Sequence, residues 1–385
     1  MRFWCKKLML PDIDCVGCGA CANACPENCL NMIADKKGFL HPEIKTDACI
    51  NCAACEKACP VINKNQKAEE SIPVYAVYSK NDNVRISSSS GGVFYTIAKH
   101  VIENGGIVYG AAFDENLYLS HKGVESIEDL YILQGSKYLQ CDTKLCFREI
   151  KTHLNNKRPV LFCGTTCQTE GLLHYLKKPY ENLFILDFIC HGVPSPKAWQ
   201  EYIKYQEKAF SSEVSSAYFR DKAEGWSLFS SKLKFKNQKE YSNIHYNDSY
   251  MKAFLQNVSL RKSCYNCKFK TVNRSSDITM GDLWGIKNIL PDITDDKGVS
   301  VVFIQSEKGK SLFEQISQSL WIQEISLDSA LASNSAMTKS VYEHNFRDYF
   351  FKNLGKQNFE RLVKDCLEPS YYVRLKRKLN KIMSE

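Results

Sequence analysis

A run of cysteines near the N-terminus has the residue types and spacing to bind an iron–sulfur cluster. The pattern Cys-x2-Cys-x2-Cys-x3-Cys-Pro starts at Cys15 and recurs 34 positions later from Cys49. A cubane needs four converging thiolates, and two-residue gaps allow one loop to wrap three of its corners. The fourth cysteine of each run reaches the other cluster where two runs are present, so the pattern predicts two [4Fe–4S] clusters. Their predicted ligands are Cys15, Cys18, Cys21 and Cys59 for one cluster, and Cys49, Cys52, Cys55 and Cys25 for the other.

Two structural zinc sites are the alternative interpretation of this repeat. Zinc sites usually pair two Cys-x2-Cys arms across a longer gap, whereas three ligands followed by Cys-Pro, in two copies, favour iron–sulfur. A segment of about sixty residues also buries too little apolar surface to fold without such clusters. We therefore predict an electron-carrying domain of the two-cluster ferredoxin type.

Further cysteines downstream suggest a third site without establishing it. Cys264 and Cys267 form a single Cys-x2-Cys arm, and Cys167 and Cys190 each follow a predicted strand. The carboxyl ends of parallel strands meet at one edge of a sheet, where ligands bind. The spacing leaves two possibilities open: a third four-thiolate site, or independent buried thiols. Cys163 competes with Cys167 for a place in such a site.

Two short segments are candidates for binding phosphate. SSSSGGVF (87–94) and GTTCQ (164–168) place hydroxyls and free amides at predicted helix starts, which attract anions. Ordinary helix capping explains either segment alone. Both segments in one α/β unit favour a nucleotide-like cofactor, and fusion to an electron-carrying domain points to a flavin.

The elements that must position these residues alternate between strand and helix. Strands are expected at 74–79, 107–113, 159–164, 182–192 and 299–305, with helices at 93–103 and 196–210 and an antiparallel strand at 227–236. Such alternation predicts a sheet that is mainly parallel and covered by helices. The expected fold is an α+β ferredoxin-like N-terminal domain, then an α/β domain with a mainly parallel sheet and a helical C-terminal tail.

The chain divides into five expected regions. They are a two-cluster ferredoxin domain (1–63), a linker (64–73), the N-terminal part of a flavin domain (74–155), its C-terminal part with the third cluster site (156–335) and a helical basic tail (336–385).

Composition excludes several classes of protein. The chain of 385 residues has 44% hydrophobic residues, 24% charged residues and a net charge of +8, a normal globular balance. Its apolar runs are too short for a membrane span or a signal peptide, and it has no recognisable nucleic-acid module. We expect a cytoplasmic protein. The basic segment 371–385 is a candidate contact for an anionic membrane surface or an acidic ferredoxin, unless it covers its own domain.

Several motifs together resemble a known family. They are GSKYLQ (135–140), FCGTTCQTEGL (162–172), DFICHGVPSP (187–196), SCYNCKF (263–269) and RSSDITMGDLWG (274–285). In combination they resemble the beta-subunit family of coenzyme F-420-reducing hydrogenases and formate dehydrogenases, over roughly residues 74 to 330. A ferredoxin module is fused ahead of this region.

The resemblance implies a cofactor set and site residues. Family members bind FAD non-covalently beside a cluster, so the implied third [4Fe–4S] ligands are Cys167, Cys190, Cys264 and Cys267. The implied FAD contacts are Ser89, Ser90, Gly91, Gly92, Lys137, Tyr138, Gln140, Thr165, Thr166 and Gln168, with His191 lining the pocket. Thr166 stands where the family usually has proline. Asp277, Asp282 and Trp284 are interpreted as orienting the Cys264 loop.

The expected function is that of an iron–sulfur flavoprotein oxidoreductase. It would pass electrons between a ferredoxin or another redox protein, its clusters, FAD and a two-electron small-molecule donor or acceptor. The resemblance does not extend to coenzyme F-420 as the substrate. Two alternatives are an electron-transfer subunit of a larger redox complex with no substrate of its own, and a cluster-bearing sensor.

Overall fold

The computed structural model describes residues 14–63 and 70–369, and its largest element is a mixed eight-stranded sheet. The strand order across the sheet is β13-β3-β12-β11-β7-β6-β4-β5. The strands are β3 (Val74–Ser79), β4 (Ile107–Phe113), β5 (Leu119–Val124), β6 (Val160–Thr165), β7 (Leu183–Phe188), β11 (Ile278–Asp282), β12 (Ser300–Ile304) and β13 (Leu320–Glu324). The expected strands of the α/β region are therefore present.

Parallel pairing occupies the centre of this sheet. Strands β11, β7, β6 and β4 run parallel to their neighbours within that group. The outer pairings, β4 with β5 and those linking β11, β12, β3 and β13, are antiparallel. The expected parallel strands thus form the core of the sheet, and antiparallel strands extend it on both sides.

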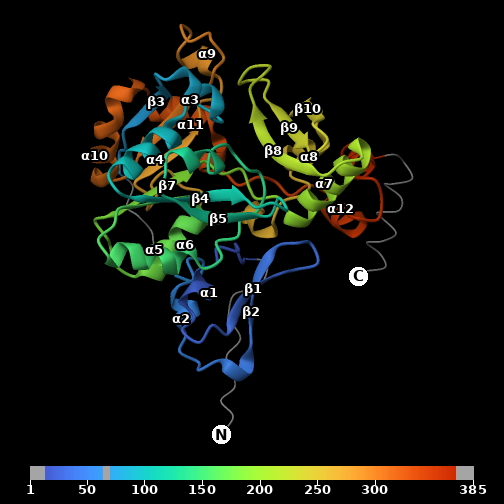
Figure 1. The fold of residues 1–385 in the computed structure, drawn as a ribbon, viewed down its shortest axis with the longest axis horizontal. Helices are drawn as coiled ribbons and strands as arrows, with labels where there is room; N and C mark the ends of the chain where they lie inside the picture. The colour runs from blue at the N-terminus through green and yellow to red at the C-terminus, as the bar shows by residue number, and fades with distance from the viewer. Residues whose placement is uncertain (1–13, 64–69, 370–385) are drawn as a thin grey trace.

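Helices cover both faces of the sheet, as Figure 1 shows. One face packs against α4 (Val93–Glu103) and α10 (Glu307–Ile316), with Val108 and Leu161 in the shared core. The opposite face packs against α5 (Cys146–Asn155) and α6 (Thr166–Leu176). Alternation along β6 produces these two cores, because successive side chains point to opposite faces. The remaining helices of this region are α3 (Asp82–Ser87), α9 (Ile286–Ile289) and α11 (Leu327–Ser333), with 3-10 turns η2 (Glu128–Ile132), η3 (Lys262–Asn266), η4 (Ser317–Ser319) and η5 (Ser335–Met337).

A second core lies beside the large sheet. The antiparallel strands β8 (Val214–Asp221), β9 (Ser230–Phe235) and β10 (Glu240–Ile244) form a small sheet, which includes the antiparallel strand expected at 227–236. Its helices are α7 (Pro196–Phe210), α8 (Ser249–Leu255), α12 (Arg347–Asn353) and α13 (Phe359–Leu367). These elements bury Trp199 and a set of aromatic side chains in one apolar cluster. The helices α12 and α13 bear out the expected helical tail in part, and its last segment, 371–385, lies outside the described residues.

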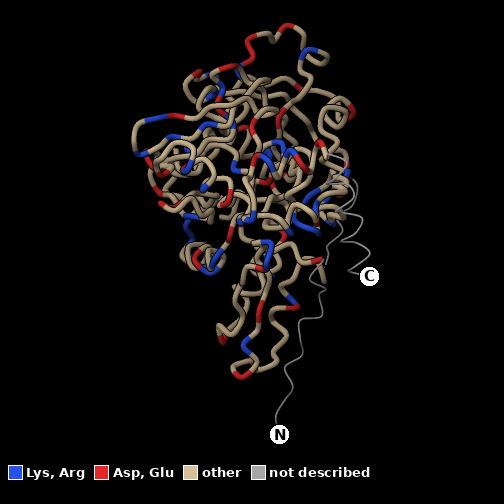
Figure 2. The backbone as a smooth tube through the Cα atoms, turned by 90° about the vertical axis from the view of Figure 1, so that its right-hand side faces the viewer, with Lys and Arg blue, Asp and Glu red and all other residues tan. Residues whose placement is uncertain are grey.

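The N-terminal domain, residues 14–63, projects from the body that residues 70–369 form, as Figures 1 and 2 show. It contains α1 (Ala20–Ala24), the antiparallel pair β1 (Leu30–Ala34) and β2 (Leu40–Ile44), the turn η1 (Thr46–Ala48) and α2 (Ala54–Lys57). Ala20 packs into the core shared with α5 and α6. Arg148 of α5 donates hydrogen bonds to the carbonyl oxygens of Asn23 (2.8 Å) and Cys25 (2.6 Å). Apolar contact and hydrogen bonds therefore join this domain to the body. Within the described ranges, no helix has the length and apolar character needed to span a membrane.

Candidate functional site

Cys15, Cys18, Cys21 and Cys59 form the first thiol group, which lies where the N-terminal domain meets the body. Burial raises the pKa of the Cys18 thiol well above its ordinary value, and the nearby thiols Cys21, Cys59 and Cys15 raise it further. The loop reaches this arrangement through left-handed glycines such as Gly19, at φ 74°. A Cβ on Gly19 would lie 2.0 Å from the Thr143 hydroxyl oxygen, so only glycine fits there. The structure thus brings together the four cysteines of the first predicted ligand set.

The second thiol group consists of Cys25, Cys49, Cys52 and Cys55, which line one small pocket in the N-terminal domain. A fifth cysteine, Cys29, also lines it, and its Sγ lies 3.4 Å from Cys25 Sγ. Sequence reasoning missed Cys29 because it has no counterpart in the repeat: the residue 34 positions later is Asn63.

The third thiol group consists of Cys167, Cys190, Cys264 and Cys267, gathered at the carboxyl edge of β6 and β7. Burial raises the pKa of Cys264 to about 12, with Cys190 and Cys267 adding to the shift. Burial also raises the pKa of Cys167, with contributions from Cys267, Cys190 and Cys18. Three distant segments therefore converge here, and Cys18 of the first thiol group lies next to them.

Cys163 does not belong to the third thiol group. Burial raises its pKa to about 12, and the charged groups that influence it are Asp187 and Lys137 rather than another thiol. Its side chain packs against the apolar core under α4. Because β6 ends at Thr165, Cys167 falls in the first turn of α6 instead, at the loop edge. Its position just after the end of β6 therefore places Cys167, rather than Cys163, in the third thiol group.

The chemistry of these donor sets suits iron–sulfur clusters. Each group offers four thiols with no histidine or carboxylate among them, and every cysteine in the described part of the chain is free. Gly171 of α6 leaves room for the first group, because a Cβ there would lie 3.0 Å from Cys18 Sγ. Across residues 14–63 and 70–369, no three His, Cys, Asp or Glu side chains are arranged to hold a single metal ion.

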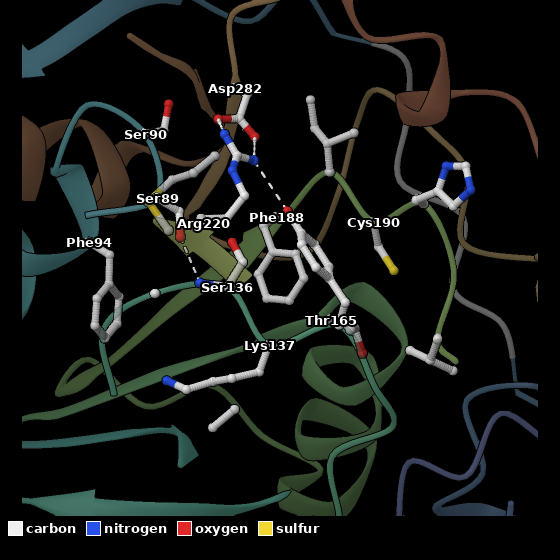
Figure 3. A pocket seen from close by; sticks show the side chains of 18 of the residues that line it. Ser89, Ser90, Phe94, Ser136, Lys137, Thr165, Phe188, Cys190, Arg220 and Asp282 are labelled. Atoms are coloured by element: carbon white, nitrogen blue, oxygen red, sulfur yellow. Dashed lines mark hydrogen bonds and ion pairs between the residues drawn. The ribbon is translucent and has the colours of Figure 1, made fainter. Parts of the chain in front are cut away.

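A cavity of about 740 Å³ opens beside the third thiol group, at the carboxyl ends of β6 and β7. Cys167 and Cys190 line it, together with Val16 and Gly17 of the loop that carries the first group. Its lining includes most of the predicted flavin contacts, namely Ser89, Ser90, Gly92, Lys137, Tyr138, Gln140, Thr165, Gln168 and His191. Figure 3 shows several of these side chains around the cavity.

Two predicted contacts lie elsewhere. The Thr166 hydroxyl donates to Asp187 Oδ2 (2.9 Å) and accepts from Arg274 (2.9 Å), in a buried polar network behind the loop. Gly91 donates its N–H to Ser300 Oγ (3.0 Å), and a Cβ on Gly91 would lie 2.3 Å from Val77 O. Neither residue lines the cavity. Their hydrogen bonds shape the two loops instead.

One end of the cavity has the features of an anion site. Gly92 is the N-cap of α4, so free amides of the first turn face this end. Ser89 Oγ accepts a hydrogen bond from Ser136 N (2.6 Å), as Figure 3 shows. This bond ties the serine loop, residues 87–90, to the segment GSKYLQ (135–140). Lys137 donates to the carbonyl oxygens of Ile132 (3.0 Å) and Gln134 (2.8 Å). Burial lowers the pKa of Lys137 to about 7.

A buried ion pair that sequence reasoning missed forms another wall. Arg220 makes two hydrogen bonds of 3.0 Å to Asp282, and a third to the Tyr138 hydroxyl oxygen (3.2 Å), as Figure 3 shows. Trp226 Nε1 donates to Asp282 Oδ1 (2.9 Å), and its ring stacks on Trp284 at 4.8 Å. Asp282 and Trp284 therefore shape the cavity, which corrects the expectation that they orient the Cys264 loop. No signal in the sequence marks Arg220.

Asp277, expected in the same role, is also placed differently. It accepts hydrogen bonds from Ile185 N (2.8 Å) and from the Ser306 hydroxyl, so it links β7 to the start of α10. His191 lines the cavity and lies 2.7 Å from Asn257 Oδ1 through Nε2. Burial lowers the pKa of His191, so the structure favours a neutral ring at this wall.

Comparison with known proteins matches both parts of the chain. Residues 14–63 match the model of the 4Fe–4S dicluster domain, and residues 157–329 match that of the C-terminal region of the coenzyme F420 hydrogenase/dehydrogenase beta subunit. No curated protein matches the chain. A chain of the xenon-derivatised F420-reducing [NiFe] hydrogenase complex from Methanosarcina barkeri is similar at 14% identity and a TM-score of 0.47, over 70% of this chain and 92% of that one. That structural likeness is too weak to support an argument. The two matches identify residues 14–63 as a 4Fe–4S dicluster domain and residues 157–329 as a region of the coenzyme F420 hydrogenase/dehydrogenase beta-subunit family, so the chain combines an iron–sulfur electron-transfer domain with that family region.

Proposed function

We propose that the chain is an oxidoreductase that uses FAD and [4Fe–4S] clusters to pass electrons between a ferredoxin-type protein and a two-electron substrate. The observation that carries the proposal is the adjacency of the cavity and the thiol groups. Cys167 and Cys190 belong both to the cavity wall and to the third thiol group. Cys18 of the first group lies beside Cys167. A cofactor in the cavity would therefore neighbour a row of cluster sites leading into the N-terminal domain.

We assign one [4Fe–4S] cluster to each thiol group. The first and second groups are the ligands of the dicluster domain, with Cys59 and Cys25 crossing between the two sequence runs. The third group would hold a cluster at the cavity wall. Each group is made of thiols alone, which is the donor set that such clusters require.

The cavity suits FAD in size and in lining. Its volume of about 740 Å³ lies in the range of cofactor pockets, roughly 300–1,000 Å³. The start of α4, the serine loop and Lys137 would hold the phosphates, since helix N-termini and cations attract anions. We propose as FAD-binding residues the predicted contacts that line the cavity: Ser89, Ser90, Gly92, Lys137, Tyr138, Gln140, Thr165, Gln168 and His191. When bound, FAD supplies two-electron chemistry toward a substrate and one-electron chemistry toward clusters.

The other cavity residues would orient the cofactor and exclude water. Phe188 and Met280 provide apolar surface, and the Arg220–Asp282 pair is satisfied internally, so it adds no unpaired charge. This wall would help to hold the cofactor in the cavity that Cys190 also lines.

An electron-transfer subunit without its own substrate remains the second candidate, because the matched family is described as a beta subunit. In that case a catalytic partner would supply or remove the electrons.

A cytoplasmic location and a redox-protein partner belong to both proposals. The many free thiols support a reducing compartment.

Anaerobic purification of the full chain, with iron, sulfide and flavin measured per chain, tests the proposal. Three cubanes and one flavin predict about twelve irons and about one FAD. Cys167→Ser should lower the iron to about eight, because it removes one ligand of the third cluster. Cys163→Ser is the matched control, since it removes a buried thiol four positions away and should keep about twelve irons.

Loss of iron from the control variant and retention in Cys167→Ser would contradict the ligand assignment. Purified chain without flavin that also fails to bind added FAD would contradict the cofactor assignment. Reduction of a small-molecule acceptor by the isolated chain separates the oxidoreductase from the electron-transfer subunit.

A further inference from the structure

Arg261 stands at the junction of the N-terminal domain and the third thiol group. It is only 2% exposed and immediately precedes η3, which carries Cys264. Its Nε donates to the Cys15 carbonyl oxygen (2.7 Å), and its Nη2 donates to the Leu40 carbonyl oxygen (3.0 Å). Nη1 lies 3.4 Å from Gln140 Oε1, at the cavity wall. One guanidinium thus holds the loop of the first thiol group against the segment that bears the third.

Among the described residues, the positive charge of Arg261 has no carboxylate partner, unlike the charges of the other buried arginines. The other buried arginines of the described chain each face a carboxylate: Arg85 with Asp295, Arg220 with Asp282, Arg274 with Asp187 and Arg347 with Asp348. Within the same described residues, Arg261 forms no ion pair. Its hydrogen-bond partners are carbonyl oxygens, the Gln140 side chain and the His41 ring. A buried charge without a counter-ion is costly, so an anion is expected nearby.

We infer that Arg261 is the positioning residue and shared counter-charge of the first and third cluster sites. The inference rests on the proposed function, since the missing anions would be the two clusters. Four thiolates around a cubane leave each site negatively charged, and reduction adds one further negative charge. Arg261 reaches the first site through the Cys15 carbonyl oxygen, and it reaches the third through the N–H of Cys264, which donates to the Arg261 carbonyl oxygen (3.1 Å).

This placement has a consequence for electron transfer. A fixed positive charge stabilises the reduced cluster more than the oxidised one, so it raises the reduction potential of both clusters. The hydrogen bonds also hold the two cluster loops at a constant separation. Ser263 supports the geometry without adding charge, because its hydroxyl donates to the same Cys15 carbonyl oxygen (3.0 Å).

Redox titration of the intact protein, followed by electron paramagnetic resonance, tests the role of Arg261. Arg261→Gln should keep about twelve irons and lower the midpoint potential of the first and third clusters. We expect about a tenfold smaller ratio of reduced to oxidised cluster at a fixed potential, which corresponds to about 59 mV for one electron. Arg261→Lys should stay close to the wild-type potential, because it keeps the charge.

Two matched variants separate charge from structure. Arg347→Gln removes a buried arginine that donates to the adjacent Leu260 carbonyl oxygen (3.0 Å) and lies 3.8 Å from the exposed Asp348 carboxylate, which also pairs with Lys37, so the cluster potentials should move less than in Arg261→Gln. Ser263→Ala removes a hydrogen bond to Cys15 without a change of charge, and its shift should be smaller than that of Arg261→Gln.

Unchanged potentials in an iron-replete Arg261→Gln variant would overturn the inference, as would an equal shift in Arg347→Gln. If Arg261→Gln loses iron, Arg261→Lys decides, because an iron-replete lysine variant with strongly lowered potentials would exclude the counter-charge role. If the wild-type chain holds about eight irons, the assignment of a third cluster is wrong, but the potential of the first cluster still tests the role of Arg261.

Discussion

At the scale of single residues, the site depends on where each side chain falls relative to the end of its element. Cys163 and Cys167 are four positions apart, yet Cys163 lies in strand β6 under α4 and Cys167 lies in the first turn of α6 at the loop edge. Lys137 shows the same dependence, because burial at the cavity wall lowers its pKa to about 7. The residue type indicates the possible chemistry, and the local environment decides whether that chemistry is available.

The pKa of Lys137 predicts a pH-dependent affinity for FAD. The pyrophosphate would stabilise the charged amine and raise its pKa on binding, so affinity should be highest below about pH 7 and fall as the pH rises. A rise of one pKa unit corresponds to about a tenfold loss of affinity over this range. Fluorescence titration of deflavinated protein with FAD from pH 6 to 9 measures it.

Lys137→Met should abolish this pH dependence and bind FAD with the weaker, high-pH affinity. Lys122→Met is the control, since Lys122 donates to the Phe113 carbonyl oxygen (3.3 Å) and does not line the cavity. An unchanged pH profile in Lys137→Met would show that another group titrates.

At the scale of elements, a buried polar network joins the strand ends that carry the third thiol group. Asp187 near the end of β7 pairs with Arg274 at 3.1 Å, and both side chains are almost fully buried. The carboxylate also accepts from the hydroxyls of Thr166, Ser276 and Thr279. The network therefore ties α6, β7 and β11 together directly behind the Cys167 and Cys190 loops.

Asp187→Ala should destabilise the protein strongly, because it leaves the guanidinium of Arg274 buried without its counter-charge. The expected loss in the free energy of unfolding is about 3–5 kcal/mol. Anaerobic urea denaturation followed by circular dichroism measures it. Glu125→Ala, which breaks an exposed pair with Arg158, should cost less than about 1 kcal/mol. Similar urea midpoints for the two variants would refute this role of the network.

At the scale of the whole molecule, the N-terminal domain projects from the body (Figures 1 and 2), and the thiol groups run from the body into this domain. The cavity and the third group lie in the body, and the first group lies at the junction. The second group lies in the projecting domain, where Cys52 is exposed. The second cluster is therefore expected to be the entry point for electrons from a protein partner.

A double Cys49→Ser and Cys52→Ser variant should lose about four irons and keep its flavin. Stopped-flow reduction of the flavin by reduced ferredoxin should slow by at least about 100-fold, because the entry cluster is missing. Reduction by a small mediator that reaches the cavity should be unaffected. Cys29→Ser is the matched control in the same pocket and should retain its iron and its rate. An undiminished ferredoxin rate in the double variant would place the entry point elsewhere.

The sequence by itself determined the features that depend on short-range spacing. The two cysteine runs define their thiol groups because a cubane is wrapped by a local loop, and the strand–helix alternation defines the parallel centre of the sheet. Local patterns also pointed to two segments that line the cavity, SSSSGGVF (87–94) and GTTCQ (164–168), since glycine, serine and threonine mark helix starts at strand ends.

Only the tertiary structure decided which distant segments share a site. Arg220 on β8 meets Asp282 on β11, and Arg261 reaches the backbone of Cys15, 246 positions away. Thr166 lies next to a ligand candidate in sequence yet turns into a buried network. Burial and charge pairing between distant segments depend on packing, and no local pattern encodes that packing.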